Sequence, residues 1–359
     1  MKNTVKKLSV PYNNDFRGTA GLLIKYKEHI SEVYFPINPQ ILGSGRGAID
    51  HEYYDDIIKA LIGIAKNNDI KTNMIINQIG GSEFFADDKF LKRVLDYVDY
   101  FCNVQGVNFV TVTNPILAKN ISRVTSYAKV VASVNMFINS FVGINKAMQL
   151  GISEFYLDRE SNYNIDFIKK VKDNFKNIKM RIMLNEGCIP NCLFRQSHFD
   201  CVGLMQSQES EQKLRKYEEM HRISGCQISY SNDLSLLLKT PIIRPEDLKY
   251  YTPYIDTFKV VGRTTSTFIN EMRIKAYSEE IFNGDFILLN DNGVARQVME
   301  KKGLKIANER FPLDYAEKRF MCEGFCSDCN YCNGLVDELI EKEEKSKRST
   351  QLGDINILK

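Results

Sequence analysis

The sequence has no long apolar run. None of its stretches approaches the roughly 20 apolar residues of a bilayer-spanning helix, so we expect no membrane span. Its first fifteen residues, MKNTVKKLSVPYNND, also lack the apolar stretch of a secretion signal. Both absences predict a cytoplasmic protein, and structural disulfides are rare in the reducing cytosol.

Two hydrolase motifs are absent as well. The sequence contains no His-Glu-x-x-His stretch to hold a hydrolytic zinc ion and no Gly-x-Ser-x-Gly stretch to present a serine nucleophile. We therefore expect no activated nucleophile and no hydrolytic zinc site to form around its four histidines, which are His29, His51, His198 and His221.

Composition and charge name no macromolecular partner. The 359 residues include 48 basic and 45 acidic side chains, which leaves a formal charge of +3. No basic stripe with interleaved aromatic residues stands out, so nucleic acid binding is not indicated. With 43% hydrophobic residues, the chain is long enough for one large core plus an appendage.

Short β-branched apolar runs alternate with stretches whose apolar residues recur at three- and four-residue steps. Strands are predicted at residues 32–38, 71–77, 107–114, 128–135, 153–160, 179–187, 236–246 and 257–263. Helices are predicted at residues 55–68, 90–101, 114–124, 139–151, 164–175 and 267–282. This alternation gives parallel strands with helical crossovers, and eight such units fit an α/β fold of the (βα)8 TIM-like barrel type. An open doubly wound sheet is the alternative. We expect the barrel over residues 1–283 and a cysteine-rich C-terminal extension over 284–359.

The nine cysteines are unevenly distributed. A pair, Cys188 and Cys192, lies in NEGCIPNC at the end of the predicted strand 179–187, and four cysteines fall within eleven residues of the extension. Thiolates are the ligands that iron–sulfur clusters and zinc select, and one every three or four residues lets a short loop wrap a metal centre. We therefore predict a metal role, with a zinc knuckle or redox-active thiols as alternatives, for Cys322, Cys326, Cys329 and Cys332. Cys102, in an amphipathic helix, is expected to be buried as an apolar residue.

The predicted strands end in polar residues. Barrel active sites lie at the carboxyl ends of the strands, so these side chains are expected to converge on one mouth. The alternative for each Asn or Asp is that it only caps the next helix or makes a turn. The residues are Asn38, Asn77, Asn114, Asn135, Asp158, Asn185, Glu186, Arg244, Glu246 and Arg263.

Three segments carry a resemblance to a known family. Residues 130–160 place a strand ending in Asn135 before a helix, a Leu-Gly turn and a strand with an acidic end. Residues 180–192 place two cysteines on the loop after a strand, and residues 224–230 contain the next cysteine, Cys226. Residues 240–277 contain a Lys-x-x-Gly-Arg pattern at Lys259, Gly262 and Arg263. Together, over residues 20–280, they resemble the collagenase-like peptidase family U32, which includes members that act in oxygen-independent hydroxylation.

The resemblance implies a 4Fe-4S cluster at the barrel mouth, with Cys188, Cys192 and Cys226 as three ligands. The fourth ligand must come from elsewhere, either from Cys201 or from the extension. Because four closely spaced thiolates can satisfy a cluster unaided, two clusters are favoured over one that borrows a tail cysteine.

The chemistry we predict is a redox reaction such as hydroxylation on an anionic or aromatic small molecule. Glu186 or Asp158 is expected to move protons. The expected substrate-binding residues are Arg244, Lys259, Arg263 and Asn135. A partner subunit or an electron donor is also implied.

Three other functions remain as alternatives. The family's peptidases carry a Gly-Ser-type loop before their first cysteine, whereas Asn185 to Gly187 precede Cys188 here, so a collagenase-like peptidase is disfavoured. A radical S-adenosylmethionine enzyme would match Cys322-x3-Cys326-x2-Cys329, but this run follows the last strand and Asp328 replaces the expected aromatic residue. The third is a non-catalytic electron-transfer or scaffold partner.

Overall fold

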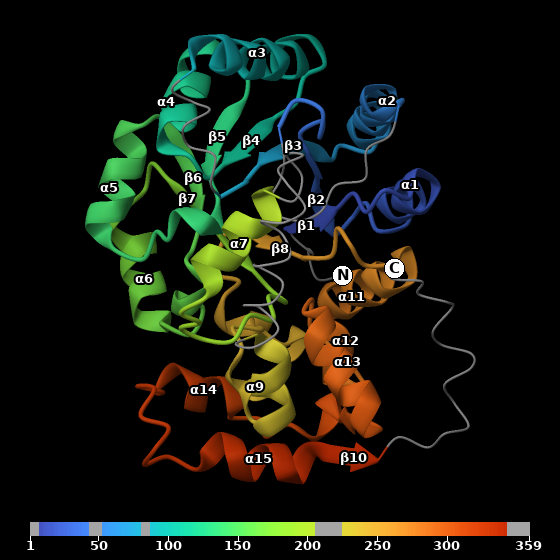
Figure 1. The fold of residues 1–359 in the computed structure, drawn as a ribbon, viewed down its shortest axis with the longest axis vertical. Coiled ribbons are helices and arrows are strands. Elements are labelled where there is room, and N and C mark those ends of the chain that lie inside the picture. The colour runs from blue at the N-terminus through green and yellow to red at the C-terminus, as the bar shows by residue number, and fades with distance from the viewer. Residues whose placement is uncertain (1–6, 43–51, 80–86, 205–224, 343–359) are drawn as a thin grey trace.

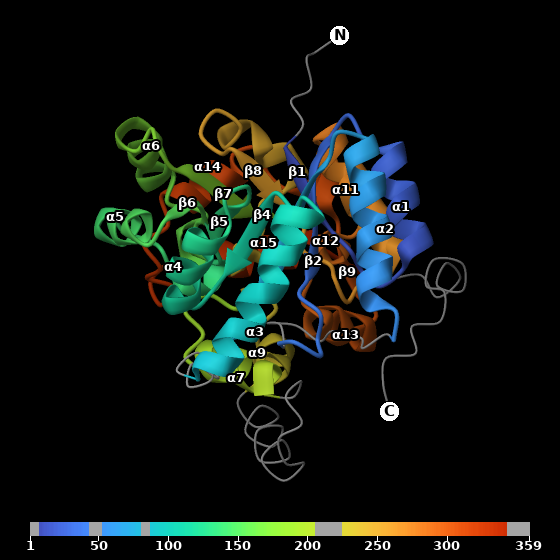
Figure 2. The same cartoon turned by 90° about the horizontal axis from the view of Figure 1, so that it is seen from above.

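Eight parallel strands close into a barrel in a computed structural model that describes residues 7–42, 52–79, 87–204 and 225–342. Each strand pairs with the next along the chain, and the last pairs with the first. Helices surround the strands (Figures 1 and 2). The (βα)8 prediction is therefore confirmed. The strands are β1 (Leu8–Pro11), β2 (Ile30–Pro36), β3 (Lys71–Ile76), β4 (Phe109–Val112), β5 (Lys129–Ala132), β6 (Ile152–Tyr156), β7 (Lys179–Met183) and β8 (Thr257–Lys259).

Most crossovers contain one amphipathic helix. In α4, the side chain of Asn114 accepts hydrogen bonds from two amides of the first turn, Pro115 opens the helix, and Leu117 and Ile121 are buried against the sheet. Asn114 is thus a helix cap, as the alternative interpretation of the polar strand ends predicts. The surrounding helices are α1 (Phe16–Lys25), α2 (Tyr54–Asn67), α3 (Asp88–Asp99), α4 (Pro115–Val124), α5 (Phe141–Gln149), α6 (Ile165–Asn174) and α11 (Thr267–Glu279). Cys102 is fully buried just beyond α3, as predicted.

One strand predicted from the sequence is wrong, and one observed strand was not predicted. Residues 236–246 form the short helix α10 (Leu236–Lys239) and a 3-10 turn over Pro245–Tyr250 instead of a strand. Pro241 between them has no N–H to donate to a neighbouring strand. The missing strand is β1, whose four residues Leu8–Pro11 are too few for a clear apolar alternation, although all of them are buried.

A buried cluster of charged side chains lies inside the barrel. The Arg181 guanidinium contacts one carboxylate oxygen of Glu32 and one of Glu154, each at 2.7 Å, and all three side chains are at most 3% exposed. Ser9 and Asn73 donate hydrogen bonds to the other oxygen of Glu32 at 2.6 and 3.0 Å. This Arg181 cluster forms a polar layer beneath the carboxyl ends of the strands.

A second hydrophobic core joins the C-terminal extension to the segment between β7 and β8. Tyr230 and Leu237 from α9 (Cys226–Asn232) and α10 pack with Leu289, Val298 and Leu335 of the extension. In Figure 1 these elements lie together below the barrel. The division at residue 283 stays a prediction. The extension contains α12 (Phe286–Leu289), α13 (Gly293–Lys302), β9 (Leu304–Ile306), α14 (Tyr315–Phe320), α15 (Tyr331–Leu339) and β10 (Ile340–Lys342), and α7 (Arg195–Leu204) precedes α9.

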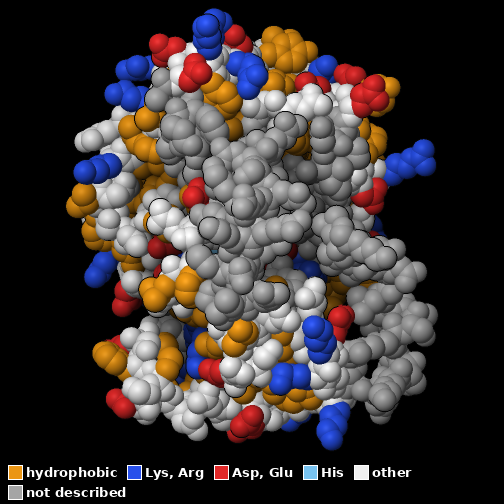
Figure 3. Space-filling model, in the orientation of Figure 1, with side chains coloured by type: hydrophobic (Ala, Val, Ile, Leu, Met, Phe, Trp, Pro, Cys, Tyr) orange, Lys and Arg blue, Asp and Glu red, His pale blue; other side chains and the backbone are white. Residues whose placement is uncertain are grey.

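Acidic and basic side chains are interspersed on the described part of the face drawn in Figure 3. This mixture agrees with the small formal charge of +3. Within the described ranges, no helix is long and apolar enough to cross a bilayer.

A buried aspartate in the turn after Arg244 gives a first testable prediction. Asp247 is 3% exposed, and burial raises the pKa of its carboxyl group to about 6 against the opposing effect of Arg244. The raised pKa contributes stability below the unfolded value near 3.9, and this contribution is lost as the pH rises through about 6. Asp247→Asn should therefore raise the free energy of unfolding at pH 7 by about 1–3 kcal/mol, measured by urea denaturation.

The gain should shrink toward pH 4, where the native carboxyl group is already protonated. Asp96→Asn on the exposed face of α3, 64% accessible, should change stability by no more than about 0.5 kcal/mol at either pH. A loss of stability in Asp247→Asn at pH 7 would mean that its charge is needed by Arg244.

Candidate functional site

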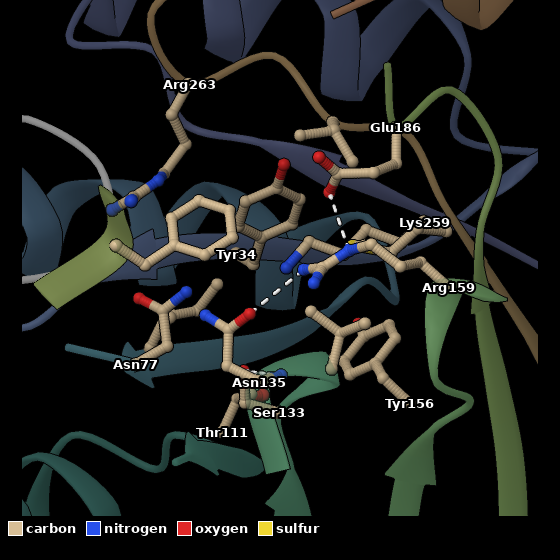
Figure 4. A pocket seen from close by; sticks show the side chains of 15 residues that line it. Tyr34, Asn77, Thr111, Ser133, Asn135, Tyr156, Arg159, Glu186, Lys259 and Arg263 are labelled. Carbon is tan, nitrogen blue, oxygen red and sulfur yellow. Dashed lines mark hydrogen bonds and ion pairs between the residues drawn. The ribbon is translucent and has the colours of Figure 1, made fainter. Parts of the chain in front are cut away.

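A pocket opens at the carboxyl ends of the barrel strands (Figure 4). Its empty space of about 530 Å³ includes space that is open to solvent, so this is an open pocket and not an enclosed cavity. Its walls combine aromatic rings, uncharged polar groups, three cationic side chains and one carboxylate. The lining residues are Tyr34, Ile75, Asn77, Thr111, Ser133, Val134, Asn135, Tyr156, Arg159, Met183, Glu186, Phe199, Lys259, Val261 and Arg263.

Arg159 enters the pocket from a short turn directly after β6 and is 1% exposed. Its Nη2 donates a hydrogen bond to Oδ1 of Asn135 at 2.9 Å, and its Nε lies 3.9 Å from Oε2 of Glu186. The Phe199 ring packs 5.3 Å from the guanidinium carbon. Arg159 was not among the predicted site residues, although it directly follows Asp158 at a predicted strand end.

Glu186 stands between Arg159 and the first cysteine of the barrel loop. One of its oxygens faces Arg159, and the other accepts a hydrogen bond from Sγ of Cys188 at 3.1 Å. Burial, followed by the charge of Glu186, raises the pKa of the Cys188 thiol to about 12, against the opposing effects of Arg159 and Arg195. Cys188 is therefore a protonated hydrogen-bond donor in this arrangement.

Lys259 and Arg263 both line the pocket, as their alternation along the chain predicts. The Lys259 ammonium group lies over the ring of Tyr34 at 3.9 Å and over that of Tyr156 at 4.9 Å. Figure 4 places Arg263 on the opposite side of the pocket from Arg159. Gly262, between Lys259 and Arg263 in the chain, leaves room for Asn270. The Asn270 side-chain amide donates a hydrogen bond to the Gly262 carbonyl at 2.9 Å, and a Cβ at position 262 would clash with it.

The other predicted site residues have different positions. Asn135 lines the pocket, but Asp158 and Arg244 do not. Asp158 is buried and accepts a hydrogen bond from Asn139 at 3.2 Å. Arg244 donates to Asn308 at 3.1 Å and packs on the Phe311 ring at 4.5 Å, at the junction with the extension. The roles predicted for Asp158 and Arg244 remain untested, but neither lies in the pocket wall.

Of the remaining polar strand ends, only Asn77 reaches the pocket wall. Asn38 donates to Asp55 at 2.9 Å. Asn185 bonds the backbone of Val261 at 2.7 and 2.8 Å and so ties the loop after β7 to the end of β8.

The loop that carries Cys188 is tied to the segment that carries Cys226. Gly187 has no room for a Cβ against Asn290, and its carbonyl accepts hydrogen bonds from Tyr230 at 2.8 Å and from Asn292 at 2.9 Å. These contacts hold the Cys188 loop against the start of α9, where Cys226 lies. Burial first, with Cys192 also contributing, raises the pKa of the Cys226 thiol. Cys188, Cys192 and Cys226 therefore form one neighbourhood, here called the barrel thiols.

The cysteines of the extension form a second neighbourhood, here called the tail thiols. Cys322, Cys326 and Cys329 are exposed, and the half-buried Cys332 lies in the first turn of α15. Gly324, at φ 82°, lets the chain turn between the first two. Burial first, and the thiols of Cys322 and Cys326 among the further causes, raise the pKa of Cys332, while Arg319 lowers it.

The donor chemistry of both groups suits a metal centre, but their geometry is not that of a formed site. In the parts of the chain that the structure describes, no three His, Cys, Asp or Glu side chains are placed so that they could hold a metal ion. The thiols nevertheless fit an iron–sulfur cluster in kind, since soft sulfur donors lie together on loops. Cys201, the other candidate fourth ligand, is buried in α7 and its Sγ donates to the Ser197 carbonyl at 2.7 Å.

Comparisons with known proteins give one sequence relative. No protein-family model matches the chain. The uncharacterized protease MJ1657 of Methanocaldococcus jannaschii is 26% identical over 328 residues, which cover 88% of this chain and 91% of that protein. Among solved structures, the U32 peptidase Mk0906 aligns with a TM-score of 0.47 and 12% identity over 58% of this chain and 80% of its own. An α-amylase from Malbranchea cinnamomea aligns with a TM-score of 0.41 and 7% identity over 92% of this chain and 80% of its own. The chain is thus similar over most of its length to a protein described as an uncharacterized protease.

Proposed function

We propose that this chain is an iron–sulfur enzyme of the U32 type that carries out an oxygen-independent redox reaction, such as hydroxylation, on a small molecule in the barrel mouth. The observation that carries the proposal is the position of Glu186. Its two oxygens face Cys188 and Arg159, so a single carboxylate links the barrel thiols to the pocket.

Support for the U32 type comes from sequence. The cysteine-bearing segment at 180–192 and the Lys-x-x-Gly-Arg pattern resemble that family, and the relative at 26% identity is described as a protease. The pocket favours an enzyme over an electron-transfer partner, because charged and polar side chains are among its lining residues and no described residue of the extension lines it.

The barrel thiols would hold one 4Fe-4S cluster and the tail thiols a second one. Such a cluster supplies electrons one at a time. No described interaction joins the two groups of thiols, which supports separate centres. The barrel site would still need a fourth ligand.

The protein's own residues would handle protons and substrate. Cys188 must lose its proton to become a metal ligand, and Glu186 at 3.1 Å is the group placed to accept it. Arg159 then provides a counter-charge for Glu186 at 3.9 Å. Lys259 and Arg263 face the same pocket from β8 and the loop after it, where they would bind the substrate.

A peptidase is the second candidate, because the relative is described as a protease. The pocket gives it little chemical support. A nucleophilic cysteine needs a lowered pKa, whereas the pKa of Cys188 is raised to about 12. The hydroxyl oxygen of Ser133, which also lines the pocket, accepts a hydrogen bond from the backbone N–H of Asn135 at 3.3 Å.

Protein isolated without oxygen should show a broad visible absorption that bleaches when dithionite is added, because thiolate-bound clusters take up electrons. The same preparation should leave gelatin intact. Spectroscopy and a gelatin cleavage assay test the two candidates side by side. Sustained cleavage that Glu186→Gln abolishes, in protein without the visible absorption, would favour the peptidase.

A further inference from the structure

Arg159 is a buried cation whose hydrogen-bonding capacity is only partly used. It is 1% exposed, and its Nε and Nη1 have no hydrogen-bond acceptor among the described residues. The 3.9 Å between Nε and Glu186 is an ion-pair distance but too long for a hydrogen bond. Buried guanidinium groups normally have their N–H groups satisfied, so these donors point to an acceptor other than the described residues.

The unused donors belong to a side chain that lines the pocket. Asn135 accepts from Nη2 at 2.9 Å, which fixes the orientation of the guanidinium plane. Figure 4 shows the guanidinium group between Asn135 and Glu186, within the space that the pocket residues surround. An acceptor that enters the pocket therefore meets a donor group that is already oriented.

We propose that Arg159 binds an oxyanion of the pocket ligand, a carboxylate or a phosphate, through Nε and Nη1. The planar guanidinium matches such groups, because two of its N–H groups can bond two oxygens of one anion. Asn135 acts as a positioning residue that holds the plane of Arg159. The proposal deepens the proposed function by naming its substrate class, but anion binding at Arg159 does not itself require iron.

The aromatic wall suits a ligand with a planar apolar body. Tyr34, Tyr156 and Phe199 line the same pocket as Arg159. Benzoate and phenyl phosphate carry such a body together with the two kinds of oxyanion. Benzamide has nearly the shape of benzoate without its charge, so this pair isolates the contribution of the anion.

The test is calorimetric titration of the full-length protein, isolated anaerobically, with benzoate, phenyl phosphate and benzamide at constant ionic strength. Benzoate or phenyl phosphate should bind at least about 10-fold more tightly than benzamide, and the tighter of the two identifies the anion. Arg159→Gln should weaken that binding by about 10- to 100-fold and leave benzamide unchanged. Asn135→Ala should weaken it by about 3- to 10-fold, and this smaller change keeps the test valid if Arg159→Gln does not fold.

Arg310→Gln is the control for the loss of one positive charge, since Arg310 is half exposed and pairs with Glu341 in the extension. It should bind all three probes as the unaltered protein does. Equal binding of the three probes by the unaltered protein, or unchanged oxyanion binding in Arg159→Gln and Asn135→Ala, would overturn the proposal. The iron content of the same samples tests the proposed function separately, because anion binding at Arg159 does not require iron.

Discussion

Replacing Arg181 with methionine should leave the barrel unfolded or close to unfolding at ordinary temperature. Its guanidinium lies 2.7 Å from Glu32 and from Glu154, and all three side chains are at most 3% exposed. Methionine would leave two buried carboxylates without their cation. Removing one partner from a buried ion pair costs about 3–5 kcal/mol, and here two pairs are lost. Because a domain is stable by only about 5–15 kcal/mol, urea denaturation should show most of this stability lost.

A second variant tests whether the uncompensated charge is the cause. Combining Arg181→Met with Glu32→Gln and Glu154→Gln removes all three charges and should recover at least half of the lost stability. Lys172→Met breaks the half-exposed pair with Asp256 and should cost no more than about 1 kcal/mol. Stability in Arg181→Met equal to that of the unaltered protein would refute the structural role of the Arg181 cluster.

Replacing Cys188 with alanine should remove about half of the bound iron and leave the fold intact. Cys188 would be a ligand of the barrel cluster only, so about four of roughly eight iron atoms per chain should be lost. The loop follows a strand instead of building the core, so circular dichroism should stay unchanged. Colorimetric iron determination on anaerobically prepared protein measures the effect.

Two further variants complete this experiment. Cys326→Ala with Cys329→Ala should remove the other half of the iron, because these thiols belong to the tail group. Cys102→Ala is the matched control, since Cys102 is fully buried and outside both groups, and it should keep all of the iron. Full iron retention in Cys188→Ala would move the ligands elsewhere, and complete loss in either cysteine variant would favour one shared centre.

Apolar periodicity was enough to predict the barrel, but not its first strand. Helices such as α2 and α6 bury one face, and this leaves a clear three- and four-residue pattern. β1 has only four residues, and Ser9 within it points to Glu32 in the barrel interior, so no apolar run marks it. The leucine run at 236–238 packs in the second core, where a short helix buries apolar residues as well as a strand would.

The site residues could be predicted where side chains alternate along an extended chain, but not where the chain turns. Lys259 and Arg263 reach the pocket because side chains alternate along an extended chain. Arg159 belongs to a 3-10 turn after β6, which brings it into the pocket while its neighbour Asp158 stays outside the wall. Arg244 failed to reach the pocket because the predicted strand that would carry it there is a helix followed by a turn.

The most direct test of the iron–sulfur account is the iron and acid-labile sulfide content of protein purified and kept without oxygen. The account predicts about eight of each per chain, and about four of each would keep one centre and reject the second. Zinc is measured in the same sample, because it is the alternative metal for the tail thiols. Protein that contains zinc alone, or no metal, after anaerobic isolation would contradict the account.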